Sequence, residues 1–448
     1  MSRTLLIPVE TAAREFDGKL LLALTARERG WDVFLGSQGA IRQCSAGLPK
    51  GVYLSKSARR TNKKHFSRMR VEGHRIAVLD EEVLIRESDD IYGMKHEMGA
   101  FDDVGLVLSW GDDSKKLLQN LPQLKNVEVV ATGNPRIDML SKGVRQYYSD
   151  EIAQLKSQHG DYVLFNGNFA SVNHFISGHT RFKLASWVSK AQRTELFEEV
   201  RARKTSLMES FVCLLPELAK QIAPKKLIIR PHPSESDEVW KRAMKDTENA
   251  EVIFQGSVIP WILGAEMVVH SGCTTAVEAT IMGVPCVSLS PFPDSDLSLP
   301  DALSLRCSTE AGVVEAVDNL LRGQQEFNPA SPANNALLAD YIVNDARELS
   351  CCRILDQLER KFYDTPFDVE SDANRKADVP VRELLKEFAR RLFLKTWLGK
   401  YSRSYSDRKF PELKKDFVEK QIGVFQRILG DFDGVKLEKV EKNVFRLK

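Results

Sequence analysis

The sequence predicts an α/β protein made of two facing Rossmann-like domains with a helical extension at the C-terminal end. Short apolar runs typical of buried parallel strands alternate with stretches of helical periodicity. The alternation pauses at a polar segment near residues 142–160 and then begins again. Each series is long enough for one parallel sheet with its crossover helices. We therefore expect a first Rossmann-like domain at 1–150 and a second at 151–330.

The individual elements follow from the same patterns. The strands expected in the first domain are Thr4–Val9, Asp32–Leu35, Val52–Leu54, Arg75–Leu79, Leu106–Ser109 and Val127–Ala131, with helices at Arg14–Arg29, near 58–72 and at Asp113–Asn120. The strands expected in the second domain are Tyr162–Asn166, Lys226–Arg230, Glu251–Phe254, Met267–His270 and Cys286–Leu289, with helices over 192–222, 236–246, 258–264, 274–282 and 310–322.

The C-terminal extension differs from both domains in composition. Residues 331–362 are predicted to form one long helix that packs on the domains, and Asp364–Pro380 is an acidic, proline-containing linker. Residues 381–448 are expected to form a basic amphipathic helical tail. Its first part, 381–420, could lie on an anionic membrane surface or could pack on the protein through its apolar face.

Bulk composition is that of a water-soluble globular protein. Hydrophobic residues make up 43% of the chain and charged residues 28%, and the net charge is only +2. No apolar run reaches the length of a membrane span, and the N-terminus is predicted to be a core strand rather than a signal peptide. We expect a cytoplasmic location, with contact to the inner face of the cytoplasmic membrane as an alternative. The seven cysteines form no CxxC pair and no cluster with the eight histidines, so no metal site is expected.

The most informative motif is the strand 226–230 followed by Pro231-His232-Pro233. Ligands of parallel sheets bind at the carboxyl ends of the strands, and His232 is expected there. The flanking prolines restrict its backbone, and an imidazole beside Arg230 would suit a phosphate oxygen. A purely structural turn histidine is the alternative.

A second motif combines a strand, a hydroxyl-rich turn and the start of a helix. The first amides of such a helix lack internal partners and carry the positive end of its dipole, so they can bind a phosphate. Glu278 lies one turn further on, where it could accept hydrogen bonds from ribose hydroxyls. Ordinary helix capping explains part of the pattern but not the whole turn. The residues expected to bind the nucleotide here are Ser271, Gly272, Thr274 and Thr275.

Acidic residues follow two predicted strands of the first domain. Glu10 ends the first strand, with Arg14 one helical turn later, and Asp80-Glu81-Glu82 follows the strand ending at Leu79. Either Glu10 or Glu81 could act as general base or nucleophile. Solvated charge or helix capping is the competing interpretation, and the spacing does not decide between the two clusters.

Two further signals concern ligands. Asn166 and Asn168 flank a glycine after the first strand of the second domain, where their amides could contact the nucleotide. Between residues 56 and 70 there are seven cations and no acids, which favours an anionic partner such as an acidic glycan or a lipid-linked glycan. A nucleic acid is not expected, because one aromatic residue cannot form a stacking platform. The acceptor-binding residues predicted from this region are Arg14, Lys56, Arg59 and Arg60.

Over about residues 4–290 the motifs resemble those of a family called surface carbohydrate biosynthesis proteins. The matching stretches are Leu6-Ile7-Pro8-Val9-Glu10-Thr11 with Arg14-Glu15, Arg29-Gly30, Leu35-Gly36, Leu48-Pro49-Lys50-Gly51-Val52-Tyr53, Gly73-His74, Leu79-Asp80-Glu81-Glu82, Thr132-Gly133-Asn134-Pro135-Arg136 and Asn168-Phe169. More distantly, Arg230–Pro233 and Ser271–Thr275 resemble paired motifs of polysialyltransferases, capsule Kdo (3-deoxy-manno-octulosonic acid) transferases and teichoic-acid polyol-phosphate transferases.

This resemblance implies a metal-independent glycosyltransferase of the GT-B fold that builds capsule, O-antigen or other surface polysaccharide. It implies that His232 and the 271–275 turn hold the phosphate of a cytidine nucleotide, and that the donor is a CMP-linked ulosonic acid such as Kdo. No cofactor is expected apart from the nucleotide-sugar donor. The alternatives are a CDP-polyol-phosphate transferase, an epimerase of UDP-sugars and a non-catalytic nucleotide-sugar-binding protein.

Overall fold

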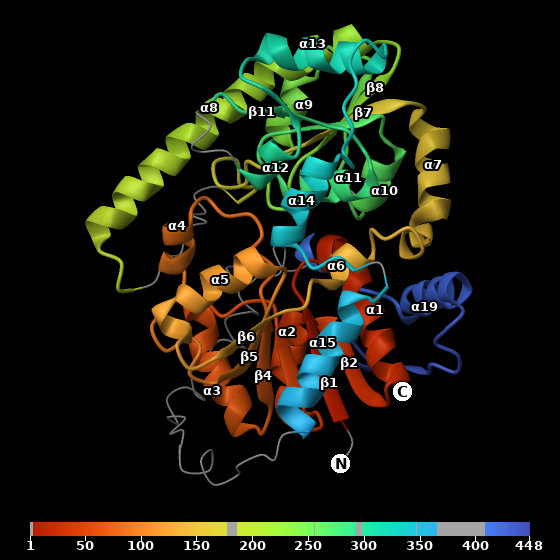
Figure 1. Cartoon of the computed structure of the whole chain (residues 1–448). Helices are drawn as coiled ribbons and strands as arrows, with labels where there is room; N and C mark the ends of the chain where they lie inside the picture. Colours follow the sequence, from red (N-terminus) through yellow and green to blue (C-terminus); the bar gives the residue numbers. More distant parts are fainter. Residues whose placement is uncertain (1–2, 177–185, 255, 293–297, 346, 365–407) are drawn as a thin grey trace. The chain divides into compact units, whose positions relative to one another are not determined.

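The computed structural model describes residues 3–176, 186–254, 256–292, 298–345, 347–364 and 408–448 (Figure 1). The chain divides into two compact units, each built on one sheet of mainly parallel strands, which confirms the predicted fold class. Unit 1 comprises Met1–Val83, His96–Met139 and Asp340–Lys448, and unit 2 comprises Leu84–Lys95 and Leu140–Ala339. Both units are therefore assembled from separated stretches of chain, unlike the contiguous ranges expected from the sequence.

The described part of unit 1 contains a sheet with the strand order β13-β14-β2-β1-β3-β4-β5-β6. All pairs from β2 to β6 are parallel, as the continuous apolar runs predict for strands buried on both faces. The bounds of these parallel strands are β1 Arg3–Val9, β2 Trp31–Ser37, β3 Val52–Ser55, β4 Arg75–Leu79, β5 Val104–Ser109 and β6 Glu128–Ala131.

Helix α1 (Ala12–Glu28) connects β1 to β2 and carries the largest apolar run of unit 1. Its residues from Leu20 to Leu24 are fully buried, and the helix packs against α6 and α15. The other helices of this part are α2 Gln38–Cys44, η1 Ser45–Gly47, η2 Arg60–Asn62, α3 Lys63–Val71, α5 Asp112–Asn120, η3 Pro122–Leu124 and α6 Pro135–Asp138.

The predicted single helix over 331–362 is interrupted. It consists of α14 (Pro332–Tyr341) and α15 (Ser350–Glu359), followed by the π-helical turn η6 (Arg360–Asp364). The amide of Val343 donates to the carbonyl of Trp110 at 2.7 Å, which takes the backbone out of helical pairing. The carboxylate of Asp138 then accepts from the amides of Ser350 at 2.8 Å and Cys351 at 2.9 Å, so that it caps the start of α15.

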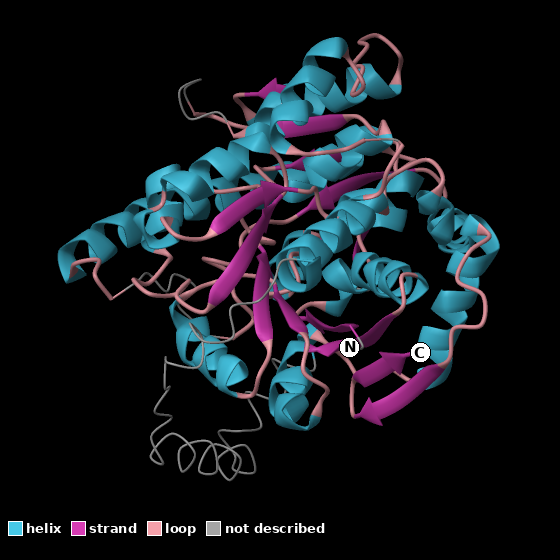
Figure 2. Ribbon diagram, turned by 60° about the horizontal axis from the view of Figure 1, so that its bottom comes forward, coloured by secondary structure: helices cyan, strands magenta, loops and turns pink. Residues whose placement is uncertain are grey.

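The described part of the predicted helical tail contains a helix and a β-hairpin. After α19 (Lys415–Leu429), strands β13 (Leu437–Glu441) and β14 (Val444–Leu447) form an antiparallel pair, and β14 pairs with β2 (Figure 2). Arg446 donates twice to the carboxylate of Asp32, at 2.7 Å each, which fastens the hairpin to unit 1. Residues 381–407, which include most of the proposed membrane-binding segment 381–420, lie outside the described residues. Across the described ranges, no helix combines the length and apolarity that a bilayer span requires.

The described part of unit 2 contains a parallel sheet with the strand order β12-β11-β10-β7-β8-β9. The order places β10 and β8 on either side of β7, so three predicted motif strands are neighbours. The bounds are β7 Tyr162–Asn166, β8 Lys226–Arg230, β9 Ala250–Val252, β10 Met267–His270, β11 Cys286–Leu289 and β12 Leu305–Cys307.

One face of this sheet is covered by α8 (Lys190–Ile222), α9 (Glu238–Ala243) and α13 (Glu310–Leu321). Buried side chains from these helices form one apolar cluster with β7, β8, β10 and β11. Helix α8 begins with a capping box between Ser189 and Gln192, and its C-terminal half carries the buried residues. The remaining helices of unit 2 are α4 Asp89–Met94, η4 Val144–Tyr148, α7 Ser149–His159, α10 Ile259–Gly264, α11 Thr274–Met282 and α12 Leu299–Ala302.

Candidate functional site

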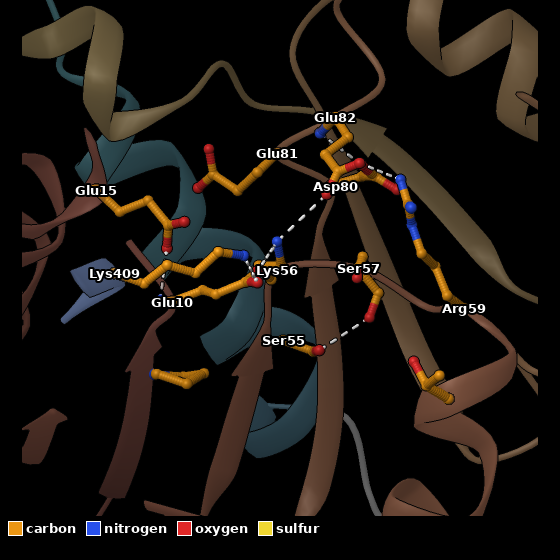
Figure 3. A network of polar contacts seen from close by, with 12 residues as sticks. Glu10, Glu15, Ser55, Lys56, Ser57, Arg59, Asp80, Glu81, Glu82 and Lys409 are labelled. Carbon is orange, nitrogen blue, oxygen red and sulfur yellow. Dashed lines mark hydrogen bonds and ion pairs between the residues drawn. The ribbon is translucent and has the colours of Figure 1, made fainter. Parts of the chain in front are cut away.

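In unit 1, the carboxylate of Glu10 lies between two lysines (Figure 3). Glu10 follows β1 and Lys56 follows β3, so both stand at the carboxyl edge of the sheet. Glu10 Oε1 accepts from Lys409 Nζ at 2.7 Å, and its other oxygen contacts Lys56. The backbone amide of Glu10 donates to Glu15 at 3.0 Å, and Glu15 is held in turn by Lys19 at 2.7 Å. Glu10 is thus fixed by its side chain and by its backbone.

These contacts determine the charge of Glu10. Burial favours the neutral acid, but the ammonium groups of Lys56 and Lys409 outweigh this effect and lower the pKa of Glu10 to about 2. Lys56 is charged as well. Burial lowers its pKa, but the carboxylates of Glu82 and Glu10 outweigh this effect and raise it. Glu10 is therefore an ionised but weakly basic carboxylate in this arrangement.

The second acidic cluster lies beside the first. Lys56 Nζ contacts Glu82 Oε1 at 3.3 Å, and Arg59 pairs with the same carboxylate. Glu81 is almost completely buried and lies 3.8 Å from Arg136. The carboxylate of Asp80 accepts a hydrogen bond from the amide of Glu82 at 2.8 Å and so stabilises the turn that follows β4.

The structure thus brings both predicted carboxylate clusters of unit 1 together, and it adds cations that the sequence did not point to. Arg14 is an electrostatic neighbour of the second cluster, since burial and Arg136 lower its pKa while Glu81 raises it. Arg136 comes from α6, and Lys409 lies 399 residues from Glu10 in the chain. No local sequence pattern could have linked Lys409 to Glu10.

The run of cations between residues 56 and 70 is not left uncompensated. Lys56 and Arg59 pair with Glu82, Arg68 pairs with Glu72 at 3.3 Å, and Arg70 pairs with Asp103 at 2.6 Å. These acids come from outside the run and pair with four of its seven cations, and an anionic partner for this region stays a prediction. Arg60 opens η2, and its side chain lies outside the described part of the structure.

In unit 2, the loops after three neighbouring strands are connected to one another. Asn166, Arg230 and His270 are the last residues of β7, β8 and β10, and they are adjacent in register. The amide of Gly167 donates to the carbonyl of Arg230 at 2.9 Å. Asn168 Nδ2 donates to the carbonyl of Gly272 at 2.8 Å, so the β7 loop contacts both other loops.

The imidazole of His232 is oriented by its own turn. The ring nitrogen Nδ1 accepts a hydrogen bond from the amide of Ser234 at 3.1 Å, and the backbone carbonyl of His232 accepts one from the amide of Glu235 at 2.7 Å. Because Nδ1 is the acceptor, a neutral ring carries its proton on Nε2. In a neutral ring of His232, which is half-buried, Nε2 is therefore the donor nitrogen.

Glu235 is a buried residue of this site for which no role was predicted. Its Oε1 accepts from the amides of Phe169 at 2.7 Å and His232 at 3.2 Å, and its Oε2 accepts from Trp240 Nε1 at 3.1 Å. Burial raises the pKa of Glu235 to about 7, although these hydrogen bonds lower it. In the sequence, the only sign of a role for Glu235 was its position three residues after His232. The folded structure adds that its carboxyl group joins the loops that follow β7 and β8.

The turn between β10 and α11, which is predicted to bind a phosphate, contains a glycine in the left-handed region. Gly272 has a φ of +59°, which a glycine adopts without strain, and Ser271 is buried beside it. Thr274 and Thr275 form the start of α11, and no side chain caps the helix from its N-cap residue Cys273. The amide of Ala276 donates to the carbonyl of Cys273 at 3.1 Å, so the amides of Thr274 and Thr275 are the ones at the start of α11 that a ligand or water could reach.

Other predicted residues of unit 2 have mainly structural surroundings. The guanidinium of Arg230 donates to the carbonyl of Gly256 at 3.1 Å and lies 4.9 Å from the ring centroid of Trp261. Burial lowers the pKa of Arg230 to about 10, although Glu151 and Tyr162 raise it. Glu278 is almost completely buried. The described contacts of Arg230 thus differ from the predicted role beside His232. Within the described ranges, no cluster of His, Cys, Asp or Glu has the makings of a metal site.

Known structures share this fold. The wall teichoic acid polymerase TagF matches with a TM-score of 0.52 at 10% identity, over 80% of this chain and 88% of that chain. A putative UDP-N-acetylglucosamine 2-epimerase from Listeria monocytogenes matches with a TM-score of 0.50 at 13% identity, over 82% of this chain and 97% of that chain. No protein-family model matches the sequence. No curated protein matches it either. At such low identity the likeness establishes the GT-B-type architecture of two α/β units.

Proposed function

We propose that this protein is a glycosyltransferase of bacterial surface polysaccharide biosynthesis that uses a nucleotide-activated donor. The observation that carries the proposal is the connection of three strand-end loops in unit 2. Asn168 ties the β7 loop to the β10 turn, and Glu235 ties it to the β8 loop. These links hold the Nε2–H of His232 and the free amides of α11 at one edge of the sheet, where a nucleotide phosphate would be bound.

The proposed reaction needs no cofactor or metal beyond the donor. The hydroxyl oxygen of a glycan acceptor forms a bond to the anomeric carbon of the donor sugar, and the bond from that carbon to the phosphate oxygen breaks. The acceptor proton goes to a general base, and the predicted carboxylates Glu10 and Glu81 are the candidates for this role. The electron pair leaves with the nucleotide phosphate, whose charge is stabilised by His232 and the α11 amides.

The choice of donor rests on the family resemblance and on the fold. Resemblance to capsule Kdo transferases supports a CMP-linked ulosonic acid as the first donor to test. A CDP-activated polyol phosphate is the second, because TagF shares the fold and its structure was obtained after a soak with CDPG. With this donor the acceptor oxygen would form a bond to the phosphorus that carries the polyol, and the bond from that phosphorus to the bridging oxygen would break, so that CMP leaves with the electron pair. An acidic or lipid-linked glycan of capsule, O-antigen or lipopolysaccharide is the proposed acceptor, reached at the inner face of the cytoplasmic membrane.

Nucleotide release from a panel of donors tests this function. The purified protein is incubated with CMP-Kdo, CDP-glycerol or UDP-N-acetylglucosamine, with and without capsular oligosaccharide, and free nucleotide is measured. We expect acceptor-dependent release from one cytidine nucleotide and a loss of about 100-fold or more in kcat/KM for His232→Ala. His159→Gln, at the end of α7 in the same unit, is the matched control and should stay within threefold.

Three results would contradict the proposal. Sugar interconversion without nucleotide release would identify an epimerase. Tight nucleotide binding without turnover across all donors and acceptors would identify a binding protein. Unchanged turnover by His232→Ala would remove the role assigned to the β8 loop.

A further inference from the structure

A lysine ends the apolar stripe of helix α8. Leu207, Phe211, Leu214 and Leu218 lie on the buried side of this helix at helical spacing. One turn before Leu207, the same stripe continues with Lys204, which is half-buried. A charged residue in this place needs an explanation other than core packing, because burying an ammonium group is costly unless it is paired.

The position of Lys204 follows from the ring contacts of the same helix. Phe211 lies 4.7 Å from Phe165 in β7 and 5.9 Å from Phe169 in the loop after that strand, centroid to centroid. Lys204 lies two turns earlier in α8, and its Nζ is 5.9 Å from the ring centroid of Phe169. Phe169 also donates its amide to Glu235. Lys204 therefore stands at the carboxyl edge of the sheet, beside the loops of the proposed donor site.

The acidic neighbours of Lys204 are engaged elsewhere. Glu87 forms an ion pair with Lys95 at 3.1 Å, and the carboxyl of Glu235 accepts hydrogen bonds from three N–H groups. Within the described part of the chain, no carboxylate forms an ion pair with Lys204. Burial lowers the pKa of Lys204 more than Glu87 and Cys273 raise it. The charge of this ammonium group is thus incompletely balanced by the protein.

Cys273 connects Lys204 to the phosphate-binding turn. It is the N-cap residue of α11 and one of the groups that interact electrostatically with Lys204. The N-terminus of α11 contributes roughly half a positive charge, and Lys204 contributes a full one. A CMP-linked ulosonic acid carries one negative charge on its phosphate and a second on the carboxylate of its sugar, whereas a nucleoside diphosphate-linked donor carries its two charges on adjacent phosphates. The combined positive charge is better matched to the second class.

Resting on the proposed function, we infer that Lys204 binds a phosphate of the donor nucleotide and adapts this site to nucleoside diphosphate-linked donors. The second phosphate lies against the ammonium group of Lys204, while the first lies at the start of α11. Among the donors considered above, this assigns the CDP-linked class to the site ahead of the CMP-linked class. The role of Lys204 is in binding and specificity, and no bond-making step is assigned to it.

Calorimetric titration of the full chain with cytidine, CMP and CDP tests the inference. For Lys204→Met, which keeps the side-chain length and removes the charge, we expect CDP affinity to fall at least tenfold, CMP affinity to fall less than threefold and cytidine affinity to stay unchanged. Lys204→Arg should recover at least part of the CDP affinity, which a merely packing role would not predict. Lys220→Met, an exposed position in the last turn of α8, is the matched control.

The outcomes separate this inference from the proposed function. If the wild-type protein binds none of these nucleotides, the proposed function fails and the inference falls with it. If the wild type binds CDP and Lys204→Met binds it equally well, only the inference is overturned. An equal loss for CMP and CDP would keep Lys204 as a phosphate ligand but would overturn the preference for diphosphates. Should Lys204→Met not fold, Lys204→Gln is titrated in its place under the same criteria.

Discussion

Glu10 in unit 1 and Glu235 in unit 2 are both glutamates just beyond the carboxyl end of a parallel strand, yet their surroundings are opposite. Glu10 contacts the ammonium groups of Lys56 and Lys409, and its pKa is lowered to about 2 although burial raises it. Glu235 accepts hydrogen bonds only from uncharged N–H groups in the contacts described above, and burial raises its pKa to about 7. The same residue type therefore serves as a fixed anion in one unit and as a titratable connector in the other.

This difference indicates how each unit can treat a charged substrate. The charges of unit 1 largely neutralise one another, so an anionic ligand there would have to displace existing ion pairs. Unit 2 offers N–H donors, the start of α11 and the ammonium group of Lys204, for which the described residues supply no ion pair. These groups are suited to an incoming phosphate. The comparison thus supports the proposal that a phosphate binds to unit 2, whereas Glu10 in unit 1 is already held as an anion by its lysines.

The largest effect is expected from removing the connector in unit 2. Glu235→Ala leaves the amides of Phe169 and His232 and the indole of Trp240 without their acceptor. Each buried unsatisfied donor costs roughly 1–3 kcal/mol, so we expect a loss of about 5 kcal/mol in the free energy of unfolding. Glu235→Gln should lose less stability. The carbonyl oxygen of the glutamine can keep the two hydrogen bonds made at Oε1, and only its NH2 group would face another donor, the indole N–H of Trp240. Urea unfolding measures both losses.

A nearby glutamate provides the control for this series. Glu238 begins α9 and is exposed, and Glu238→Ala should change the free energy of unfolding by less than about 0.5 kcal/mol. Hydrogen exchange over residues 226–246 should increase in Glu235→Ala but not in the control. Equal stability of Glu235→Ala and Glu238→Ala would show that Glu235 does not connect the loops.

Much of the fold could be predicted from the sequence because its strands are short, continuous and apolar. The predicted strand Tyr162–Asn166 and the predicted strand Lys226–Arg230 agree with β7 and β8 residue for residue. The interruption between α14 and α15 was not predictable, since it depends on Trp110 and Asp138, which are distant in the chain. The hairpin of β13 and β14 was missed for a similar reason, because its partner strand β2 lies about 400 residues earlier.

The candidate site divides in the same way. His232 and the 271–275 turn could be found because strand, turn and helix follow one another locally. Glu10 could be found as a strand-end carboxylate, but its contact with Lys409 required the folded C-terminal segment. Lys204 was hidden inside a helix, where a sequence pattern cannot tell a solvated lysine from one that faces a ligand.

A second, smaller effect is expected from pH. Glu235 has a folded-state pKa of about 7 against an ordinary value of 4.5, so its contribution to stability is fully present below pH 4.5 and is lost as the pH rises through 7. Glu10 behaves oppositely: its contribution is present above pH 4.5 and is lost only as the pH falls toward 2. The stability of wild type relative to Glu235→Gln should therefore fall by roughly 2–3 kcal/mol between pH 5 and 8.

The quantity to measure is the difference in the free energy of unfolding between wild type and Glu235→Gln, because His270 in unit 2 also titrates. Burial lowers the pKa of His270 to about 4, so its own contribution is lost as the pH falls, with a sign opposite to that of Glu235. His270 is present in both proteins and cancels in the difference. A wild-type-minus-variant stability that stays constant from pH 5 to 8 would mean that Glu235 does not titrate in this range. In Glu10→Gln, by contrast, no change of slope is expected over this range.

The smallest effect concerns the contact between Glu10 and the C-terminal segment. A double-mutant cycle of Glu10→Gln and Lys409→Met should give a coupling of about 1 kcal/mol, since both side chains are partly buried and oriented by further contacts. The exposed pair Lys415–Glu419 of α19 is the matched control, and its coupling should be below about 0.5 kcal/mol. Lys409→Met should also raise the pKa of Glu10, with Lys56 still holding it below its ordinary value. A coupling no larger than that of the control would mean that the tail is held by its hairpin alone, and that the charge state of Glu10 is set without it.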